Sequence, residues 1–393
     1  MKITDNSISP HGGTLKNFIV KDNKVIKEKL EHALKLPKLK LSTLEFSDLI
    51  MIGIGAFSPL EGFMSQADYK DVLESMRLTS GILWPLPVTL SVDNKDNKYK
   101  EGDSLALISP YDNEIVGTIE IENIYAYDKE KEALQSFGTT DVNHPGVAKL
   151  MARPDSYIGG KVTLLSEGGY PDEFPEYARP DQTREIFAEK GWETIVAFQT
   201  RNPIHRSHEY LTKIVLETYD GLFIHPIVGK LKDDDIPADI RMKCYKALLD
   251  NYYPSKRVVL KVYPMEMRYA GPKEAVLHAI IRQNFGCTHI IIGRDHAGVG
   301  SYYRPFDAQD IFDTISEKDL TIKPIKMDWT FYCEKCANMA SFKTCPHPNE
   351  DHKMISGTKL REMLSNGEYP PDYITRKEVS DILIDYYRAV KES

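Results

Sequence analysis

Residues 199–210 place an arginine, an asparagine and two histidines directly after an apolar run at 194–198. They read Gln-Thr-Arg-Asn-Pro-Ile-His-Arg-Ser-His-Glu-Tyr. Asn202 is a favourable helix N-cap, and Pro203 suits the first helical position. The segment therefore predicts a strand followed by the start of a helix, and a helix N-terminus with free backbone amides is a binding site for phosphate.

The two histidines of this segment lie three residues apart. On a helix, His205 and His208 would project from one face of the first turns, beside Arg201. Together they could hold a polyphosphate and share its growing charge. A single histidine in a first turn is more often a cap or a surface residue, and the usual helical zinc pair is four residues apart with a glutamate between. The strand end, the proline, the arginine and both histidines together favour the phosphate site.

A second candidate turn, Gly-Arg-Asp-His-Ala-Gly at 293–298, follows the apolar run 289–292. Glycine at both ends allows a ligand to approach the backbone closely. Arg294 can bind phosphate or sulfate in a fork, His296 can donate to a phosphate oxygen, and Asp295 could fix an orientation. Taken alone, this motif is equally compatible with a tight surface turn that contains a satisfied aspartate.

The segment 267–272, Met-Arg-Tyr-Ala-Gly-Pro, also follows an apolar run, and Pro272 is expected to begin a helix. Arg268 is its candidate functional residue. A turn that packs at the edge of the sheet explains the segment equally well. His144, in a loop expected near a domain interface, is a weaker candidate.

Three of the five cysteines lie close together at Cys333, Cys336 and Cys345, and His347 and His352 follow them. Three thiolates and one imidazole suit tetrahedral zinc, and four protein ligands leave no open position for catalysis. The cluster therefore predicts a structural Zn²⁺ site. A redox dithiol or unligated thiols are the alternatives, and either histidine could be the fourth ligand.

The elements around these segments alternate in type. Strands are expected at 194–198, 222–228, 258–262 and 289–292, and helices at 205–219, 236–249 and 273–284. Continuous apolar strands separated by helices predict a parallel sheet covered on both faces. Such sheets bind ligands beyond the carboxyl ends of their strands, where the two motifs fall.

The chain is expected to have three parts. Residues 1–168 read as mostly β, because their short apolar runs, separated by glycine and proline, suit a small barrel or sandwich. A proline- and acid-rich stretch at 167–180 reads as a linker into the α/β part at 169–327. Residues 328–393 carry the cysteine cluster. Further helices are expected at 66–76, 358–364 and 376–391.

Composition disfavours several classes of protein. The 393 residues carry a formal net charge of -8 and no long basic run, which argues against extended nucleic-acid binding. No stretch reaches the roughly 20 continuous apolar residues of a membrane helix. The first residues lack the apolar core of a signal peptide. We therefore expect a cytoplasmic protein with reduced cysteines.

These segments resemble the ATP sulfurylase family. The family signature is similar to Gln-x-Arg-Asn-Pro-x-His-x-x-His, which residues 199–208 match, and residues 293–298 match its second motif in full. The segment 267–272 and the N-terminal runs Gly-Ala-Phe-Ser-Pro-Leu at 55–60 and Gly-Phe-Met at 62–64 also look like the family. The resemblance covers nearly the whole chain.

The resemblance implies an α/β architecture. An N-terminal β-rich PUA-like domain would precede a central Rossmann-like nucleotidyltransferase domain of the HxxH type with a parallel sheet, and a small C-terminal zinc-binding and helical domain would follow. The implied catalytic positions are Thr200, Arg201 and Asn202. The implied sulfate-binding positions are Gln199, Arg201 and the backbone of Ala297. The implied ATP-binding positions are Gln199, Asn202, His205, His208, Gly293, Arg294, Asp295 and His296.

The same resemblance implies cofactors. Zinc-bearing members place a histidine where His352 stands, so the preferred zinc ligands are Cys333, Cys336, Cys345 and His352, with His347 as the competitor. Mg²⁺ would accompany ATP, held mainly by phosphates and water. No Gly-x4-Gly-Lys-Ser/Thr loop marks an attached adenylylsulfate kinase.

The implied activity is that of a sulfate adenylyltransferase. Sulfate would attack the α-phosphorus of ATP directly, giving adenylylsulfate (APS) and pyrophosphate as the first step of sulfate activation, with the reverse direction also open. Sulfate is already deprotonated near neutral pH, so positioning and preorganised cations are the tasks of the protein. A homodimer is expected from the family.

Two other functions stay open. A different adenylyltransferase would accept a phosphate ester or an acid, and it needs a larger and less basic acceptor pocket. A zinc-bearing protein that binds RNA through its PUA-like domain should show a basic face, which the acidic net charge disfavours.

Overall fold

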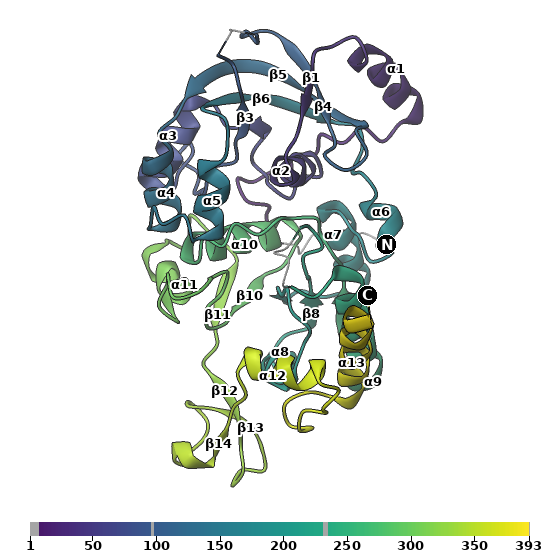
Figure 1. The fold of residues 1–393 in the computed structure, drawn as a ribbon, viewed down its shortest axis with the longest axis vertical. Helices are drawn as coiled ribbons and strands as arrows, with labels where there is room; N and C mark the ends of the chain where they lie inside the picture. Colours follow the sequence, from purple (N-terminus) through teal and green to yellow (C-terminus); the bar gives the residue numbers. More distant parts are fainter. Residues whose placement is uncertain (1–7, 96–97, 231–234, 393) are drawn as a thin grey trace.

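The computed structural model describes residues 8–95, 98–230 and 235–392, so the first seven residues of the expected 1–168 part lie outside it. Figure 1 shows an N-terminal sheet with its helices at the top, a second sheet in the middle, and a small third sheet at the bottom. No helix in these described ranges is both long and apolar enough to cross a membrane.

The N-terminal part is built on a six-stranded sheet. Its strands are β1 (Lys38–Lys40), β2 (Gly62–Phe63), β3 (Leu90–Val92), β4 (Ser104–Ile108), β5 (Ile115–Ala126) and β6 (Ser156–Leu164). They pair in the order β1-β4-β5-β6-β2, and β3 also pairs with β6. β1 runs parallel to β4, and the remaining pairs are antiparallel. The expected β-rich N-terminal part is confirmed.

This part contains more helix than the sequence predicted. Its helices are α1 (Asn23–Ala33), α2 (Thr43–Gly53), α3 (Gln66–Ser75), α4 (Lys129–Phe137) and α5 (Pro145–Met151). The helix expected at 66–76 is α3. The missed helix α2 begins with a capping box, in which Ser42 and Glu45 bond each other's backbone amides. Every residue from Glu45 to Gly53 is buried, so α2 lacks the one-sided apolar pattern by which helices are usually recognised.

The central sheet has five parallel strands. They are β7 (Ile195–Phe198), β8 (Gly221–Ile224), β9 (Val258–Leu260), β10 (His289–Ile292) and β11 (Lys323–Lys326), in the order β11-β10-β7-β8-β9. The predicted parallel sheet is therefore confirmed. β11 was not predicted, because Lys-Pro-Ile-Lys contains no apolar run. The chain moves outward from β7 to β9 and then returns to β10 on the other side of β7. The strand order therefore reverses between β7 and β10, where such sheets bind ligands.

Helices flank and connect these strands. They are α6 (Tyr170–Glu173), α7 (Pro180–Glu189), α8 (Arg206–Leu216), α9 (Ala238–Tyr252), α10 (Pro272–Asn284), the short α11 (Asp307–Asp310) and a 3₁₀ turn (Ile311–Thr314). Pro272 begins α10 as predicted. The helix predicted at 205–219 is α8, but its predicted N-cap was wrong, because His205, and not Asn202, occupies that position. The expected linker contains α6, and Glu167 pairs with Arg179 across it.

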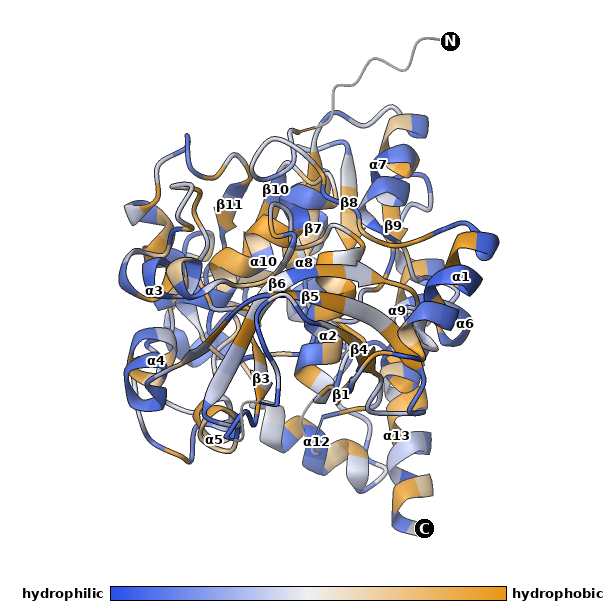
Figure 2. Cartoon of the chain, turned by 90° about the horizontal axis from the view of Figure 1, so that it is seen from above, coloured by the Kyte–Doolittle hydropathy of each residue, from blue (hydrophilic) through white to orange (hydrophobic). Residues whose placement is uncertain are grey.

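Helix α10 lies between the N-terminal part and the central sheet (Figure 1). All of its residues from Glu274 to Asn284 are buried. The Asn284 side chain donates to the backbone oxygens of Ala56 and Ser58, at 3.0 Å each. Figure 2 shows α10 largely in the hydrophobic colour near the centre and the peripheral α1 largely in the hydrophilic colour. The two parts therefore share one continuous apolar core.

The C-terminal part combines a small antiparallel sheet with two helices. The sheet is β13-β12-β14, formed by Thr330–Cys333 (β12), Asn338–Ser341 (β13) and His352–Lys353 (β14), with a 3₁₀ turn at Asn349–Asp351; the helices are α12 (Gly357–Ser365) and α13 (Lys377–Glu392). Leu383 of α13 belongs to the same core as Val196 of the central sheet. The two helices therefore pack with the central part, whereas the small sheet has an apolar core of its own. The domain boundaries at 168 and 327 stay predictions.

Candidate functional site

A pocket of about 670 Å³ opens at the carboxyl ends of β7 and β10. This volume lies within the range of pockets that bind small ligands. Both motifs line the pocket, through Gln199, Thr200, Arg201, Asn202, His205, His208, Gly293, Arg294, Asp295, His296 and Ala297. The structure therefore brings together every position that was expected to bind sulfate or ATP.

The loop after β7 is held by its own side chains. The Thr200 hydroxyl accepts a hydrogen bond from the Asn202 amide and donates to the Asn202 carbonyl oxygen, both at 3.0 Å. The buried Tyr245 hydroxyl donates to the same carbonyl oxygen at 2.8 Å. These bonds explain why no helix begins at Asn202. Thr200 braces the loop in this structure, although it lines the pocket.

Arg201 carries an unused buried donor. Its Nη1 is buried and has no hydrogen-bond partner among the described residues. Its guanidinium lies over the Tyr269 ring, 4.9 Å from the ring centre. Leaving a buried donor unpaired costs about 1–3 kcal/mol, and more for a charged group. An anion in the pocket would remove this cost, so Arg201 fits an anionic ligand.

His205 and His208 stand at the start of α8, and both line the pocket. Burial lowers the pKa of His205 to about 3, helped by the nearby His208. Burial also lowers the pKa of His208 to about 4. Both rings are therefore neutral near pH 7, and without ligand they are hydrogen-bond donors and not cations. The two histidines can neutralise the charge of a polyphosphate only if the bound anion raises their pKa values enough for the rings to become protonated.

The second motif places Arg294 and Asp295 together. Arg294 Nε lies 2.6 Å from Asp295 Oδ2, and the guanidinium stacks over the Trp329 ring at 4.0 Å. Asp295 and Ala297 both have positive φ, at 54° and 56°. Non-glycine residues rarely adopt this conformation, and strained residues cluster at functional sites. A Cβ built on Gly293 would meet no atom within 4 Å, so this backbone faces open space in which a ligand fits.

His296 is the deepest group of the second motif. Its Nε2 lies 3.0 Å from Nδ1 of His278, which is fully buried on α10. Burial lowers the pKa of His296 to about 3, with Arg282 and Arg201 acting in the same direction. His296 is therefore a neutral ring whose orientation is fixed by its contact with His278.

Arg268 and His144 do not line this pocket. Arg268 Nη2 donates to Asp48 Oδ1 of α2 at 2.6 Å, and its amide donates to Glu274 Oε1 at 2.9 Å. His144 caps α5 through Nδ1, and its Nε2 lies 3.1 Å from the Tyr269 carbonyl oxygen. Both residues therefore hold the Tyr269 loop from outside the pocket. For Arg268, these contacts favour the packing role over a role in ligand binding.

The three cysteines of the C-terminal part lie together with His347. Its Nδ1 is 3.3 Å from the sulfurs of Cys333 and Cys336 and 3.7 Å from that of Cys345. The four donor atoms lie within 4.8 Å of one another. A tetrahedral zinc site with bonds of about 2.3 Å has ligands about 3.8 Å apart, so these donors fit zinc. The group could bind a metal.

His352, the ligand preferred from the resemblance, is placed differently. Its Nε2 lies 3.5 Å from the Cys345 sulfur, and its ring stacks on Phe331 with ring centres 3.7 Å apart. His347 therefore has the more central position among the three sulfurs, which favours the competitor named from the sequence.

The sequence interpretation missed one wall of the pocket. This wall consists of Asp328, Trp329, Thr330, Phe331, Tyr332, Met339, Lys353, Met354, Ile355, Ser356, Gly357, Leu360, Tyr373 and Ile374. Trp329 follows β11, so recognising that strand would have placed an aromatic residue at a third strand end. The remaining residues lie far along the chain from both motifs and carry no local signal.

The comparisons with known proteins agree with this geometry. Residues 176–386 match the family described as ATP-sulfurylase, and residues 8–167 match the PUA-like domain. A sulfate adenylyltransferase from Desulforamulus reducens is 52% identical over 390 residues, covering 98% of this chain and 99% of the relative. One from Entamoeba histolytica is 50% identical, covering 99% and 94%.

Among solved structures, the hexameric APS kinase from Thiobacillus denitrificans superposes with a TM-score of 0.76 at 25% identity. The match covers 96% of this chain and 68% of that chain. The match to the family over more than half of the chain and the full-length relatives at about half identity lead to one conclusion. The chain belongs to the ATP-sulfurylase family.

Proposed function

We propose that this protein is a sulfate adenylyltransferase, which joins sulfate to the adenylyl group of ATP and releases pyrophosphate. The observation that carries the proposal is the buried Nη1 of Arg201, which has no partner among the described residues and lies in the pocket between β7 and β10. The curated relatives that match nearly the whole chain carry this name. The pocket walls contain both family motifs, which supports the same reaction here.

The site positions expected from the family motifs have proposed tasks. Gln199, Arg201 and the backbone of Ala297 bind sulfate, and Asn202, His205 and His208 bind the ATP phosphates. Gly293, Arg294, Asp295 and His296 surround the nucleotide. Thr200 acts by holding the loop that presents Arg201 and Asn202. Mg²⁺ would accompany ATP, held mainly by phosphates and water, and would neutralise phosphate charge.

The chemistry requires no general base, because sulfate is already an anion near neutral pH. The protein must hold two anions against their repulsion and stabilise the charge of the departing pyrophosphate. Arg201 supplies a fixed positive charge, and the neutral imidazoles supply preorganised N–H donors. Such groups need no reorganisation during the reaction, which is why they lower the barrier.

We also propose that Cys333, Cys336, Cys345 and His347 hold a structural Zn²⁺, with His352 as the alternative fourth ligand. The support is the distances among the donor atoms. Four protein ligands leave no open position, so zinc would have no catalytic part. A homodimer in the cytoplasm remains our proposal for assembly and location, on the family resemblance.

The test is pyrophosphate release from Mg-ATP with and without sulfate, comparing the unaltered protein with Arg201→Ala. Removing one such charged donor is expected to lower kcat about 10²–10³-fold. Arg304→Ala is the matched control, because the Arg304 side chain is 81% exposed and pairs only locally with Asp307. Release that does not depend on sulfate in the folded, zinc-replete protein would contradict the proposal and indicate another acceptor.

A further inference from the structure

Residues 371–376, here called the C-terminal strap, connect α12 to α13 and contact the first turn of α8. The strap is a tight turn, in which the Pro371 carbonyl oxygen accepts from the amides of Ile374 (2.7 Å) and Thr375 (3.2 Å). The Ile374 carbonyl oxygen then accepts from the Arg206 amide at 3.0 Å. The first amides of a helix have no partner within the helix. The strap therefore caps the helix that carries both pocket histidines.

The strap also reaches the ring of His205. Thr375 is fully buried, and its Oγ1 lies 2.9 Å from His205 Nδ1. A neutral imidazole has one N–H and one acceptor nitrogen, so the partner at one nitrogen decides which nitrogen carries the proton. If the threonine hydroxyl donates to Nδ1, the proton of His205 is on Nε2. The ring lines the pocket, and anionic phosphate oxygens require a donor there.

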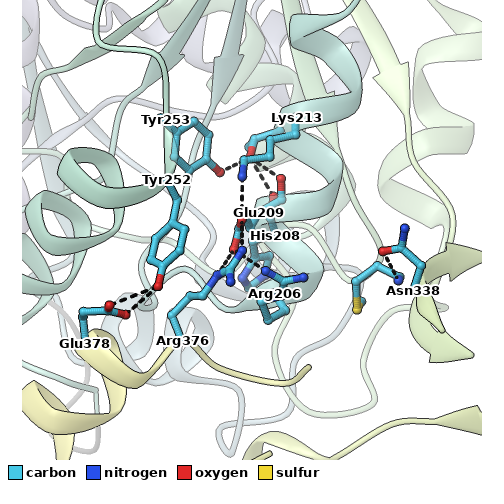
Figure 3. A network of polar contacts seen from close by, with 11 residues as sticks. Arg206, His208, Glu209, Lys213, Tyr252, Tyr253, Asn338, Arg376 and Glu378 are labelled. Carbon is cyan, nitrogen blue, oxygen red and sulfur yellow. Dashed lines mark hydrogen bonds and ion pairs between the residues drawn. The ribbon is translucent and has the colours of Figure 1, made fainter. Parts of the chain in front are cut away.

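An ionic network around the buried Glu209 fixes the strap against α8 (Figure 3). Arg376 donates to both carboxylate oxygens of Glu209, from Nε at 3.0 Å and from Nη2 at 2.8 Å. The Glu209 side chain is 4% exposed and also accepts from Lys213 at 2.7 Å. Arg376 stacks over the Tyr252 ring at 3.9 Å, and the Tyr252 hydroxyl donates to Glu378. Bidentate arginine–carboxylate pairs restrict geometry strongly.

We propose that Thr375 is a positioning residue, held in place by the Arg376–Glu209 pair, that keeps the proton of His205 on Nε2 so that the ring donates into the pocket. The identity of the pocket ligand in this inference rests on the proposed function. The tautomer of His205 does not, so the two ideas can fail separately.

The direct test is ¹⁵N NMR of the protein labelled at histidine, with His205→Gln used to assign the His205 signals. In the unaltered protein, Nδ1 is expected at the shift of an acceptor nitrogen and Nε2 at that of a protonated nitrogen. In Thr375→Val, which keeps the shape and removes the hydroxyl, the signals should move toward a mixture of tautomers. Thr375→Ser should restore the original pattern.

Kinetics give the second readout. Thr375→Val is expected to lower kcat/KM for ATP by about tenfold, less than the about 10²–10³-fold loss from deleting a donor that acts in the transition state. The KM for sulfate should stay nearly unchanged, and Thr375→Ser should recover most of the activity. Thr183→Val is the matched control, because Thr183 is also fully buried and its hydroxyl bonds the Phe285 carbonyl oxygen away from the pocket.

A protonated Nδ1 in the unaltered protein would overturn the inference, and this measurement needs no Thr375 variant. Equal losses for Thr375→Val and Thr183→Val would also overturn it, since they would indicate a general packing defect. If the tautomer is as expected but pyrophosphate release does not respond to sulfate, the proposed function fails and the positioning role remains.

Discussion

The neutral imidazoles of the pocket make stability depend on pH. Burial lowers the pKa of His205 to about 3 and that of His208 to about 4, whereas an unfolded histidine titrates near 6.5. Below pH 6.5 the unfolded chain binds protons that the folded protein does not bind. The free energy of unfolding is therefore expected to fall as the pH drops from about 6.5 to 4, by up to about 1.4 kcal/mol per pH unit for each ring.

Urea unfolding at pH 7.5 and pH 5, with and without pyrophosphate, measures this dependence. A bound polyphosphate favours the charged rings, so its stabilising effect should grow as the pH falls. The double variant His205→Asn/His208→Asn should lose both the steeper pH dependence and this extra effect. A variant with the same pH dependence as the unaltered protein would show that other groups cause it.

At the residue scale, the two motifs were predictable because each is contiguous in sequence and follows a strand. Because both strands belong to one parallel sheet, their carboxyl ends predict that Arg201 and His296 lie at the same edge. The partners of these residues were not predictable. Thr375 lies 170 positions after His205, and His278 lies on a helix whose neighbours only the fold defines. The neutral state of the rings was also missed, because burial of a side chain is a tertiary property.

At the element scale, the small sheet β13-β12-β14 links the proposed zinc ligands to the pocket. Phe331 and Tyr332 of β12 line the pocket, and Cys333 follows them directly. The buried core of this sheet is small, so the proposed zinc would contribute much of its stability. We therefore expect zinc removal to disorder this pocket wall and raise the KM for ATP.

The variants His347→Ala and His352→Ala test which imidazole binds the metal. The zinc content of the purified protein should fall in His347→Ala and stay close to normal in His352→Ala, because His347 Nδ1 lies within 3.7 Å of all three sulfurs and groups with them as a four-donor set. The KM for ATP should rise in step with the loss of zinc. The opposite pattern of zinc contents would establish His352 as the fourth ligand.

The central sheet was predictable from its local apolar pattern, which α2 and β11 lack. Four apolar runs of strand length alternate with amphipathic helices, which is the pattern of a parallel sheet. β11 contains two lysines and a proline, and pairing with β10 makes it a strand. α2 is buried on all sides, so only its capping box at Ser42 and Glu45 could have indicated a helix.

At the scale of the whole molecule, the N-terminal part supports the pocket without lining it. Asp48 of α2 and Arg268 of the central part form a buried pair, with side chains 2% and 7% exposed and 2.6 Å between Oδ1 and Nη2. Arg268 directly precedes Tyr269, whose ring carries the Arg201 guanidinium. The Asp48–Arg268 contact between the N-terminal and central parts is thus connected, through Tyr269, to Arg201, which is proposed to bind sulfate.

Breaking this pair by Asp48→Ala should leave a buried, uncompensated arginine, which typically costs about 3–5 kcal/mol. The matched control is Asp181→Ala, which breaks the more exposed Lys21–Asp181 pair between the same two parts and should cost no more than about 1 kcal/mol. Urea unfolding measures both changes.

Sulfate-dependent pyrophosphate release by the folded fraction should also fall in Asp48→Ala. The Tyr269 loop would lose the Asp48–Arg268 contact that holds it, and the Arg201 guanidinium would no longer be positioned by the Tyr269 ring. Normal release by a destabilised Asp48→Ala protein would show that the N-terminal part contributes stability alone.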